Sequence, residues 1–259
     1  MRRALLAFAL TLGLAAVATA QEYKVLFLVG DARSPEPGVV SQFTSVGGYN
    51  FTFESVVIEG GSFDGDLRGA DILWFPWNGP GHDGNYFMSG AEQAVLDFVQ
   101  NGGVVWISAF DDNFTDDQGR QVGGWLPIDE HPVIVENTGD SDVELTDAGM
   151  NDPLFTTPNT VDMNAMVLDD NFAGLDDSWV ILATRVDNGS PAVAYLPYGA
   201  GVYLEACVDT RDANRANAAA PLHENALLWL ANWIASNATA VDPAGKLTTT
   251  WGAVKAEVR

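Results

Sequence analysis

Apolar residues gather in short blocks along this chain, and their lengths predict strands. Near-continuous apolar runs at Tyr23 to Val29, Ile72 to Trp77 and Val104 to Ala109 indicate strands that are buried on both faces. Phe51 to Ile58 predicts a further strand between the first two. Strands of this kind are typical of parallel sheets covered by helices on both sides.

A helical pattern separates the last two of these runs. Apolar residues recur at helical spacing from Ser89 to Gln100, and Ser89 with Glu92 forms a capping box. Asn101-Gly102-Gly103 then supplies a left-handed stop. The result is a strand–helix–strand crossover, the unit from which parallel sheets are built.

The later part of the chain predicts three more strands and a closing helix. Val180 to Val186, Ala192 to Tyr195 and Val202 to Leu204 read as strands, and turn residues between the first two indicate a hairpin. Pro221 is expected to open the last helix, whose apolar face includes Leu227. The order of elements therefore predicts an α/β fold.

The two ends of the chain differ from its middle. Residues 1–20 combine a basic start, an apolar stretch and the cleavage-like Ala18-Thr19-Ala20, which is typical of a signal peptide. Residues 21–236 carry no linker-like interruption and are expected to form one domain, with a small, polar tail over 237–259. We therefore expect a secreted or periplasmic protein with no membrane span once the signal peptide is cleaved.

The chain is strongly acidic, with a formal net charge of −23. This charge argues against binding to nucleic acid or to anionic membrane surfaces, both of which attract cationic proteins. Two interpretations stay open, a solvated acidic shell and divalent-cation binding. Cys207 is the only cysteine, so no internal disulfide can form, and a buried, inert thiol is expected.

Polar residues follow the predicted parallel strands at the points where they end. Because such ends meet at one edge of a sheet, we expect a binding rim there. A rim rich in carboxylates suits the hydroxyls of a sugar or a hard cation such as Ca²⁺, and no other cofactor is expected. Ordinary capping and turn roles are the alternative, since Asp and Asn favour both. The candidate rim residues are Asp31, Trp77, Asn78, His82, Asp83, Ser108, Asp111, Asp112, Glu205 and Asp209.

Other chemistries have weaker support in the sequence. The acidic segment Asp111 to Asp117 lacks the ligand spacing of an EF-hand, and the histidines lack zinc-site spacing. A Ser–His–acid triad could be assembled from Ser108, either His82 or His223, and Asp111, but the G-x-S-x-G elbow is absent. His223 is expected at the surface, near the start of the last helix. Walker and GxGxxG motifs are absent, which excludes the common nucleotide-binding loops.

Several stretches together resemble the class I glutamine-amidotransferase-like superfamily, and most closely its ThuA-like (trehalose utilisation) branch. They are YKVLFLVGD, ADILWFPW, SGAEQAVLDFVQNGGVVWISAFDD, GWLPIDEHP, GAGVYLEACVD and HENALLWLANWI, which span most of residues 22–236. The resemblance implies a flavodoxin-like three-layer sandwich with a mostly parallel sheet. It also implies a carbohydrate-related role, since the ThuA-like branch is linked to sugar metabolism.

The chain departs from that superfamily at its reactive positions. Amidotransferases place a nucleophilic cysteine at the end of the strand after the GG pair, and ThuA-like proteins commonly have a histidine there, whereas this chain has Ser108. Glu205-Ala206-Cys207 stands where the family's His-x-Glu is expected. The comparison therefore implies the scaffold without glutamine amidotransferase activity.

Two functions remain as hypotheses, and whether the protein is an enzyme stays open between them. The first is a secreted ThuA-like module that binds a small carbohydrate or a partner protein at the acidic rim. The second is a carboxylate-dependent sugar hydrolase or isomerase that uses Asp31, Asp111 or Glu205 as acid and base, which requires paired carboxyls of different pKa.

Overall fold

The computed structural model describes residues 20–30, 32–58, 63–76, 91–108, 127, 133–135, 141–168, 171–173 and 175–238. The strands are β1 (Glu22–Val29), β2 (Ser45–Val46), β3 (Tyr49–Val57), β4 (Ile72–Phe75), β5 (Val104–Ser108), β6 (Val133–Val135), β7 (Val143–Leu145), β8 (Asn171–Ala173), β9 (Val180–Arg185), β10 (Pro191–Tyr198) and β11 (Gly201–Ala206). The helices are α1 (Glu36–Val40), α2 (Glu92–Gln100), α3 (Asp147–Met150) and α4 (Ala213–Ala238), with 3-10 turns η2 (Pro153–Phe155) and η3 (Met163–Ala165).

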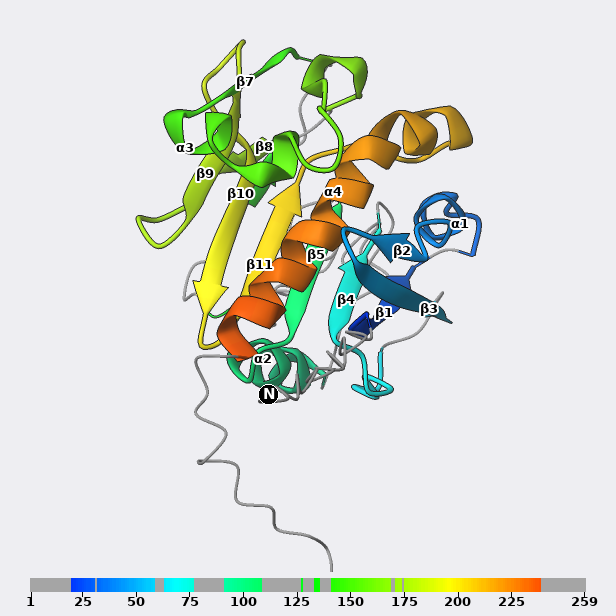
Figure 1. Ribbon diagram of the computed structural model, residues 1–259. Coiled ribbons are helices and arrows are strands. Elements are labelled where there is room, and N and C mark those ends of the chain that lie inside the picture. Colours follow the sequence, from blue (N-terminus) through cyan, green and yellow to red (C-terminus); the bar gives the residue numbers. More distant parts are fainter. Residues whose placement is uncertain are drawn as a thin grey trace, which may run out of the picture.

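One mixed sheet organises the described residues. Its nine strands run in the order β2-β3-β1-β4-β5-β11-β10-β9-β7, and β6 pairs with β8 separately (Figure 1). The neighbours from β3 to β11 are parallel, as the apolar runs predict. The strands outside this block join antiparallel, so the sheet is parallel in its centre and mixed as a whole.

Short turns explain the antiparallel side of the sheet. The predicted hairpin between β9 and β10 is confirmed, and Gly189 at its turn has φ +70°. A second hairpin joins β10 to β11 through Gly199, whose φ is +60°. Connections this short can return the chain only antiparallel, because a parallel neighbour requires a crossover of a dozen or more residues.

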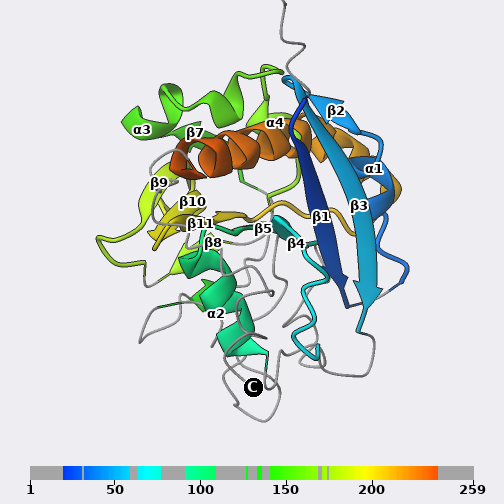
Figure 2. The ribbon, with the colours of Figure 1, turned by 60° about the horizontal axis from the view of Figure 1, so that its bottom comes forward.

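Helices cover both faces of the sheet. Side chains alternate along each strand, so Trp106 packs toward α4 while Val105 and Ile107 pack toward α2. Figure 2 shows α4 on one side of the sheet and α2 on the other. The face under α4 is completed by residues from the segment around η2 and η3, such as Leu154 and Met163.

Helix α2 ends where the sequence predicts and begins later. Its N-cap is Ala91, which makes no side-chain capping bond, and Ser89 lies outside the described residues. At the other end, Gly102 has φ +104° and the Gly103 amide donates to the Phe98 carbonyl at 2.9 Å. The glycine stop is therefore confirmed.

Helix α4 begins eight residues before the predicted start at Pro221. The Asp212 carboxylate accepts hydrogen bonds from the backbone amides of Asn214 and Arg215, at 2.8 and 3.1 Å, and so caps the helix. Pro221 lies inside the helix, at the cost of one backbone hydrogen bond. Continuous burial of this helix against the sheet keeps it helical through the proline. None of the helices in the described part of the chain is long and apolar enough to span a membrane.

Candidate functional site

The carboxyl ends of β1, β4, β5 and β11 form the edge at which the sequence places a binding rim. Of the candidate rim residues, the structure describes Ser108, Glu205 and Asp209. The others lie outside the described residues, so their part in a rim stays a prediction: Asp31, Trp77, Asn78, His82, Asp83, Asp111 and Asp112.

The structure does not bring Ser108 and Glu205 together. Ser108 pairs in register with Ala206 and lies on the α4 face of the sheet. Glu205 is one residue earlier and therefore faces α2, since successive side chains point to opposite faces. Both side chains are fully buried.

Glu205 lies among apolar residues on the α2 face, which include Tyr203 and Cys207. Neither of its carboxyl oxygens has a hydrogen-bond partner among the described residues. Burial raises the pKa of Glu205 to about 8, because the apolar surroundings disfavour its charged form. The carboxyl is therefore mostly protonated at neutral pH.

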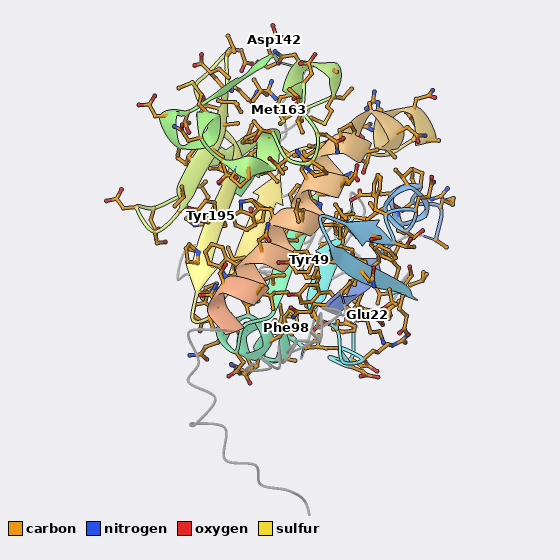
Figure 3. The ribbon with its side chains drawn as sticks, viewed as in Figure 1. Glu22, Tyr49, Phe98, Asp142, Met163 and Tyr195 are labelled. Carbon is orange, nitrogen blue, oxygen red and sulfur yellow. The ribbon has the colours of Figure 1, made fainter. Side chains whose placement is uncertain are left out.

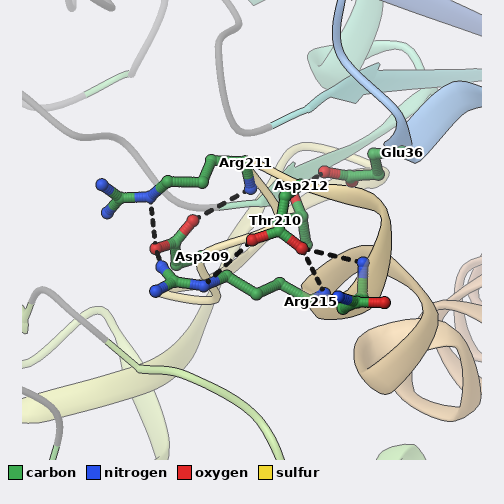
Figure 4. A network of polar contacts seen from close by, with 7 residues as sticks. Glu36, Asp209, Thr210, Arg211, Asp212 and Arg215 are labelled. Atoms are coloured by element: carbon green, nitrogen blue, oxygen red, sulfur yellow. Dashed lines mark hydrogen bonds and ion pairs between the residues drawn. The ribbon is translucent and has the colours of Figure 1, made fainter.

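Asp209, by contrast, is buried with its charge compensated (Figure 4). Its carboxylate accepts from the Arg211 backbone amide at 2.9 Å and from the Arg211 Nε at 2.6 Å. Arg215 adds a second ion pair. These contacts commit Asp209 to holding the turn between β11 and α4, which leaves it little capacity to bind a ligand.

A buried polar cluster that the sequence does not predict lies at the same edge. We call Glu36, Trp74, Thr210 and His223 the Glu36 cluster; each is fully buried. The Trp74 Nε1 donates to Glu36 Oε1 at 2.6 Å, and the Thr210 hydroxyl donates to Oε2 at 2.5 Å. The His223 Nε2 lies 3.7 Å from Oε1. The cluster therefore joins α1, β4, the turn after β11 and α4.

His223 contradicts the surface position expected for it. Its ring meets the rings of Trp74 and Trp106 edge-on, with centroids 5.3 and 5.8 Å apart. Burial lowers the pKa of His223, and the nearby Glu36 charge opposes only part of that shift, so the imidazole is neutral at neutral pH. Once α4 is extended back to Ala213, His223 shares a helical face with Leu227, and this spacing is the signal that could have predicted its burial.

Ser108 shares the α4 face with the two tryptophans that contact His223. It is two residues beyond Trp106 on β5, and its hydroxyl is buried without a hydrogen-bond partner in the described part of the chain. A hydroxyl, a neutral imidazole and a carboxylate thus occur on one face near the carboxyl edge. These are the group types of a serine hydrolase, with Glu36 in place of the Asp111 considered from the sequence.

Metal binding finds no site within the described ranges. No group of three or more His, Cys, Asp or Glu side chains there could hold a metal ion. The acidic segment Asp111 to Asp117, which motivates Ca²⁺ binding, lies outside those ranges. Ca²⁺ binding therefore stays a prediction.

A hollow of about 530 Å³ lies at the other edge of the sheet, next to Asp71 and Gly103 where β4 and β5 begin. Parallel sheets place ligands beyond the carboxyl ends of their strands, so we assign this hollow no part in the rim.

Comparisons with known proteins inform the fold alone. No protein-family model matches the chain, and no curated protein matches it in sequence. A cytoplasmic protein from Salmonella typhimurium matches in structure with TM-score 0.51 and 12% identity, over 80% of this chain and 98% of that one. A second, from Salmonella typhimurium LT2, matches with TM-score 0.50 and 12% identity, over 83% and 98%. A candidate GMP synthase protein from Thermoplasma acidophilum reaches 0.49 at 12% identity, over 85% and 96%.

Proposed function

We propose that this chain is a secreted, ThuA-like domain protein that binds a small carbohydrate or a protein partner and lacks glutamine amidotransferase activity. A glutamine-amidotransferase-like, flavodoxin-like three-layer architecture fits the motif resemblance, the helices on both faces of the sheet and the fold likeness to solved structures. Export is supported by the signal-peptide pattern of residues 1–20.

The observation that carries the proposal is the residue at the end of β5. A cysteine-dependent amidotransferase needs its thiol there, and the chain has Ser108. The lone cysteine, Cys207, follows β11 instead and is buried on the α2 face with Glu205. The thiol therefore lies on the opposite side of the sheet from His223.

The sheet topology supports binding at this edge. β1 pairs with β3 on one side and with β4 on the other, so the chain reverses direction across the sheet at β1. Ligands of open α/β sheets bind outside the carboxyl ends of strands at such a switch point. The Glu36 cluster is next to it and would hold the floor of the site rigid.

A thermal-shift titration tests the proposal. The full mature chain would be titrated with glucose, galactose, mannose and cellobiose, with and without 2 mM CaCl₂, and one sugar is expected to raise Tm saturably below ~10 mM. Saturation distinguishes binding from the general stabilisation that sugars give as osmolytes at much higher concentration. A panel without a saturable shift would refute carbohydrate binding, and release of glutamate from glutamine would refute the loss of amidotransferase activity.

A serine hydrolase is the second candidate, because the Glu36–His223 pair lies on the face that carries Ser108. In this mechanism His223 would accept the Ser108 proton as the hydroxyl attacks an acyl carbon. Labelling by a fluorophosphonate probe separates the two functions. Labelling that is lost in both S108A and H223N would support the hydrolase, whereas an unlabelled wild-type chain would exclude it.

The carboxylate-dependent sugar hydrolase or isomerase also remains an alternative. Among its candidate acids, Asp31 and Asp111 lie outside the described residues, and Glu205 faces α2. A screen with nitrophenyl glycosides tests for the hydrolase, and turnover lost in D31N or D111N would support it.

A further inference from the structure

A groove of about 450 Å³ opens beside the carboxyl-terminal half of α4. It is lined by Pro153, Trp229, Asn232, Trp233, Ser236 and Asn237. Its volume falls in the range of small-molecule sites. The groove is remote from the carboxyl edge, because the Trp233 Nε1 donates to the carbonyl of Ala200, which immediately precedes β11.

The floor of the groove is aromatic and held in place. The rings of Trp229 and Trp233 stack with centroids 5.3 Å apart and an interplanar angle of 24°. Tyr195 packs against both rings, at 5.3 and 6.0 Å. Figure 3 shows Tyr195 on the β10 side of α4 and Tyr49 on the β3 side. A fixed ring platform binds a ligand with little loss of side-chain entropy.

Neutral polar groups surround this floor. Asn232 accepts from the Tyr49 hydroxyl at 3.0 Å, and its amide nitrogen has no partner within the described ranges. The Asn237 side chain donates to the Trp233 carbonyl at 3.0 Å, which leaves its own oxygen as an acceptor toward the groove. Both donors and acceptors are therefore available to hydroxyl groups.

The acidic residue at the groove excludes anionic ligands. Asp152 precedes Pro153 and accepts a hydrogen bond from Trp229, while burial raises the pKa of Asp152. No cation lines the groove in the part of the chain that the structure describes. Phosphates and nucleotides therefore lack a counter-charge, whereas a carboxylate is a good acceptor for neutral hydroxyls.

We propose that this groove is a saccharide site in which the apolar face of a pyranose ring packs on Trp233. The ring's hydroxyls would hydrogen-bond to Asn232 and Asn237. The site is independent of the proposed carboxyl-edge rim, since it shares no residue with it.

Variants of the full mature chain test this site. Cellobiose, maltose and galactose would be titrated against tryptophan fluorescence and ¹H–¹⁵N NMR shifts, and at least one is expected to bind saturably at millimolar concentration. W233A is expected to weaken binding at least tenfold and W233F only a few-fold, because the phenyl ring keeps an apolar face. N232A should weaken it severalfold, while N217A, an exposed asparagine earlier on α4, should leave it unchanged.

Three results would overturn the site. They are an absence of saturable binding by all three sugars, binding that W233A leaves intact while circular dichroism shows a folded protein, and a groove filled by the chain's own C-terminal tail. In the last case, W251A in the full chain would increase acrylamide quenching of Trp233. Loss of binding in W233A with the edge-dependent thermal shift retained would separate this site from the proposed rim.

Discussion

Glu205 makes the stability of the protein depend on pH. Its pKa of about 8 in the folded state exceeds the value near 4.5 expected when unfolded, so between these values only the folded state holds the proton. We expect its contribution to the free energy of unfolding to be fully present below pH 4.5. It should then fall by about 1.4 kcal/mol per pH unit as the pH rises toward 8.

Urea unfolding of wild type and E205Q at pH 5, 7 and 9 measures this effect. Glutamine keeps the shape without the charge, so E205Q should gain stability relative to wild type as the pH rises. E54Q is the control, because hydrogen bonds from Lys24 and Arg68 lower the pKa of the exposed Glu54, which therefore stays ionised throughout this pH range. An E205Q difference that is equal at pH 5 and pH 9 would show that Glu205 is not buried in an ionisable state.

Single residues are where inference from the sequence ends soonest. The sequence places Ser108 and Glu205 after predicted strands, but which face each occupies depends on the register between β5 and β11. Glu36 and His223 are 187 residues apart in number and meet only through the packing of α4 on the sheet. Periodicity within one element carries no information about such contacts.

At the scale of elements, the turn between β10 and β11 is fixed by close packing on the end of α2. A Cβ atom at Gly201 would lie 2.1 Å from the Gly103 carbonyl oxygen and 2.3 Å from that of Val99. We therefore expect G201A to lower the free energy of unfolding by more than about 2 kcal/mol.

G38A is the matched control for that substitution. Gly38 is an exposed residue of α1 with no atom within 4 Å of an added Cβ. Alanine there should raise stability by about 0.5–1 kcal/mol, since it favours the helix. Urea unfolding measures both variants, and equal effects of the same sign would contradict the packing argument.

Most elements are predictable because their signals are local. The apolar runs locate β1, β4 and β5, and the Gly102 stop ends α2 as expected. The predicted start of α4 is wrong because Pro221 usually opens helices, whereas here burial of the surrounding turns outweighs the missing hydrogen bond. Tertiary packing, which propensity does not contain, decides that boundary.

At the scale of the whole molecule, net charge should limit stability. A formal charge of −23 repels itself more in the compact state than in the unfolded one. We expect 0.5 M NaCl to screen this repulsion and to raise Tm by roughly 2–4 °C, which corresponds to about 1 kcal/mol. Calorimetry measures the shift.

Choline chloride at the same concentration is the control for this prediction, because screening does not depend on which monovalent cation is present. A larger rise with CaCl₂ at matched ionic strength would favour divalent-cation binding over a solvated acidic shell. An unchanged or lower Tm in both monovalent salts would contradict the repulsion argument.

The position of α4 also bears on how the chain can fold as it is made. This 26-residue helix lies at the carboxyl end of the described chain, yet it covers one face of strands that begin at Glu22. A ribosome that has released only the first two hundred residues has therefore produced a sheet with one apolar face bare to solvent. Such a chain would be a substrate for chaperones, and its native state becomes available only after the last helix has emerged.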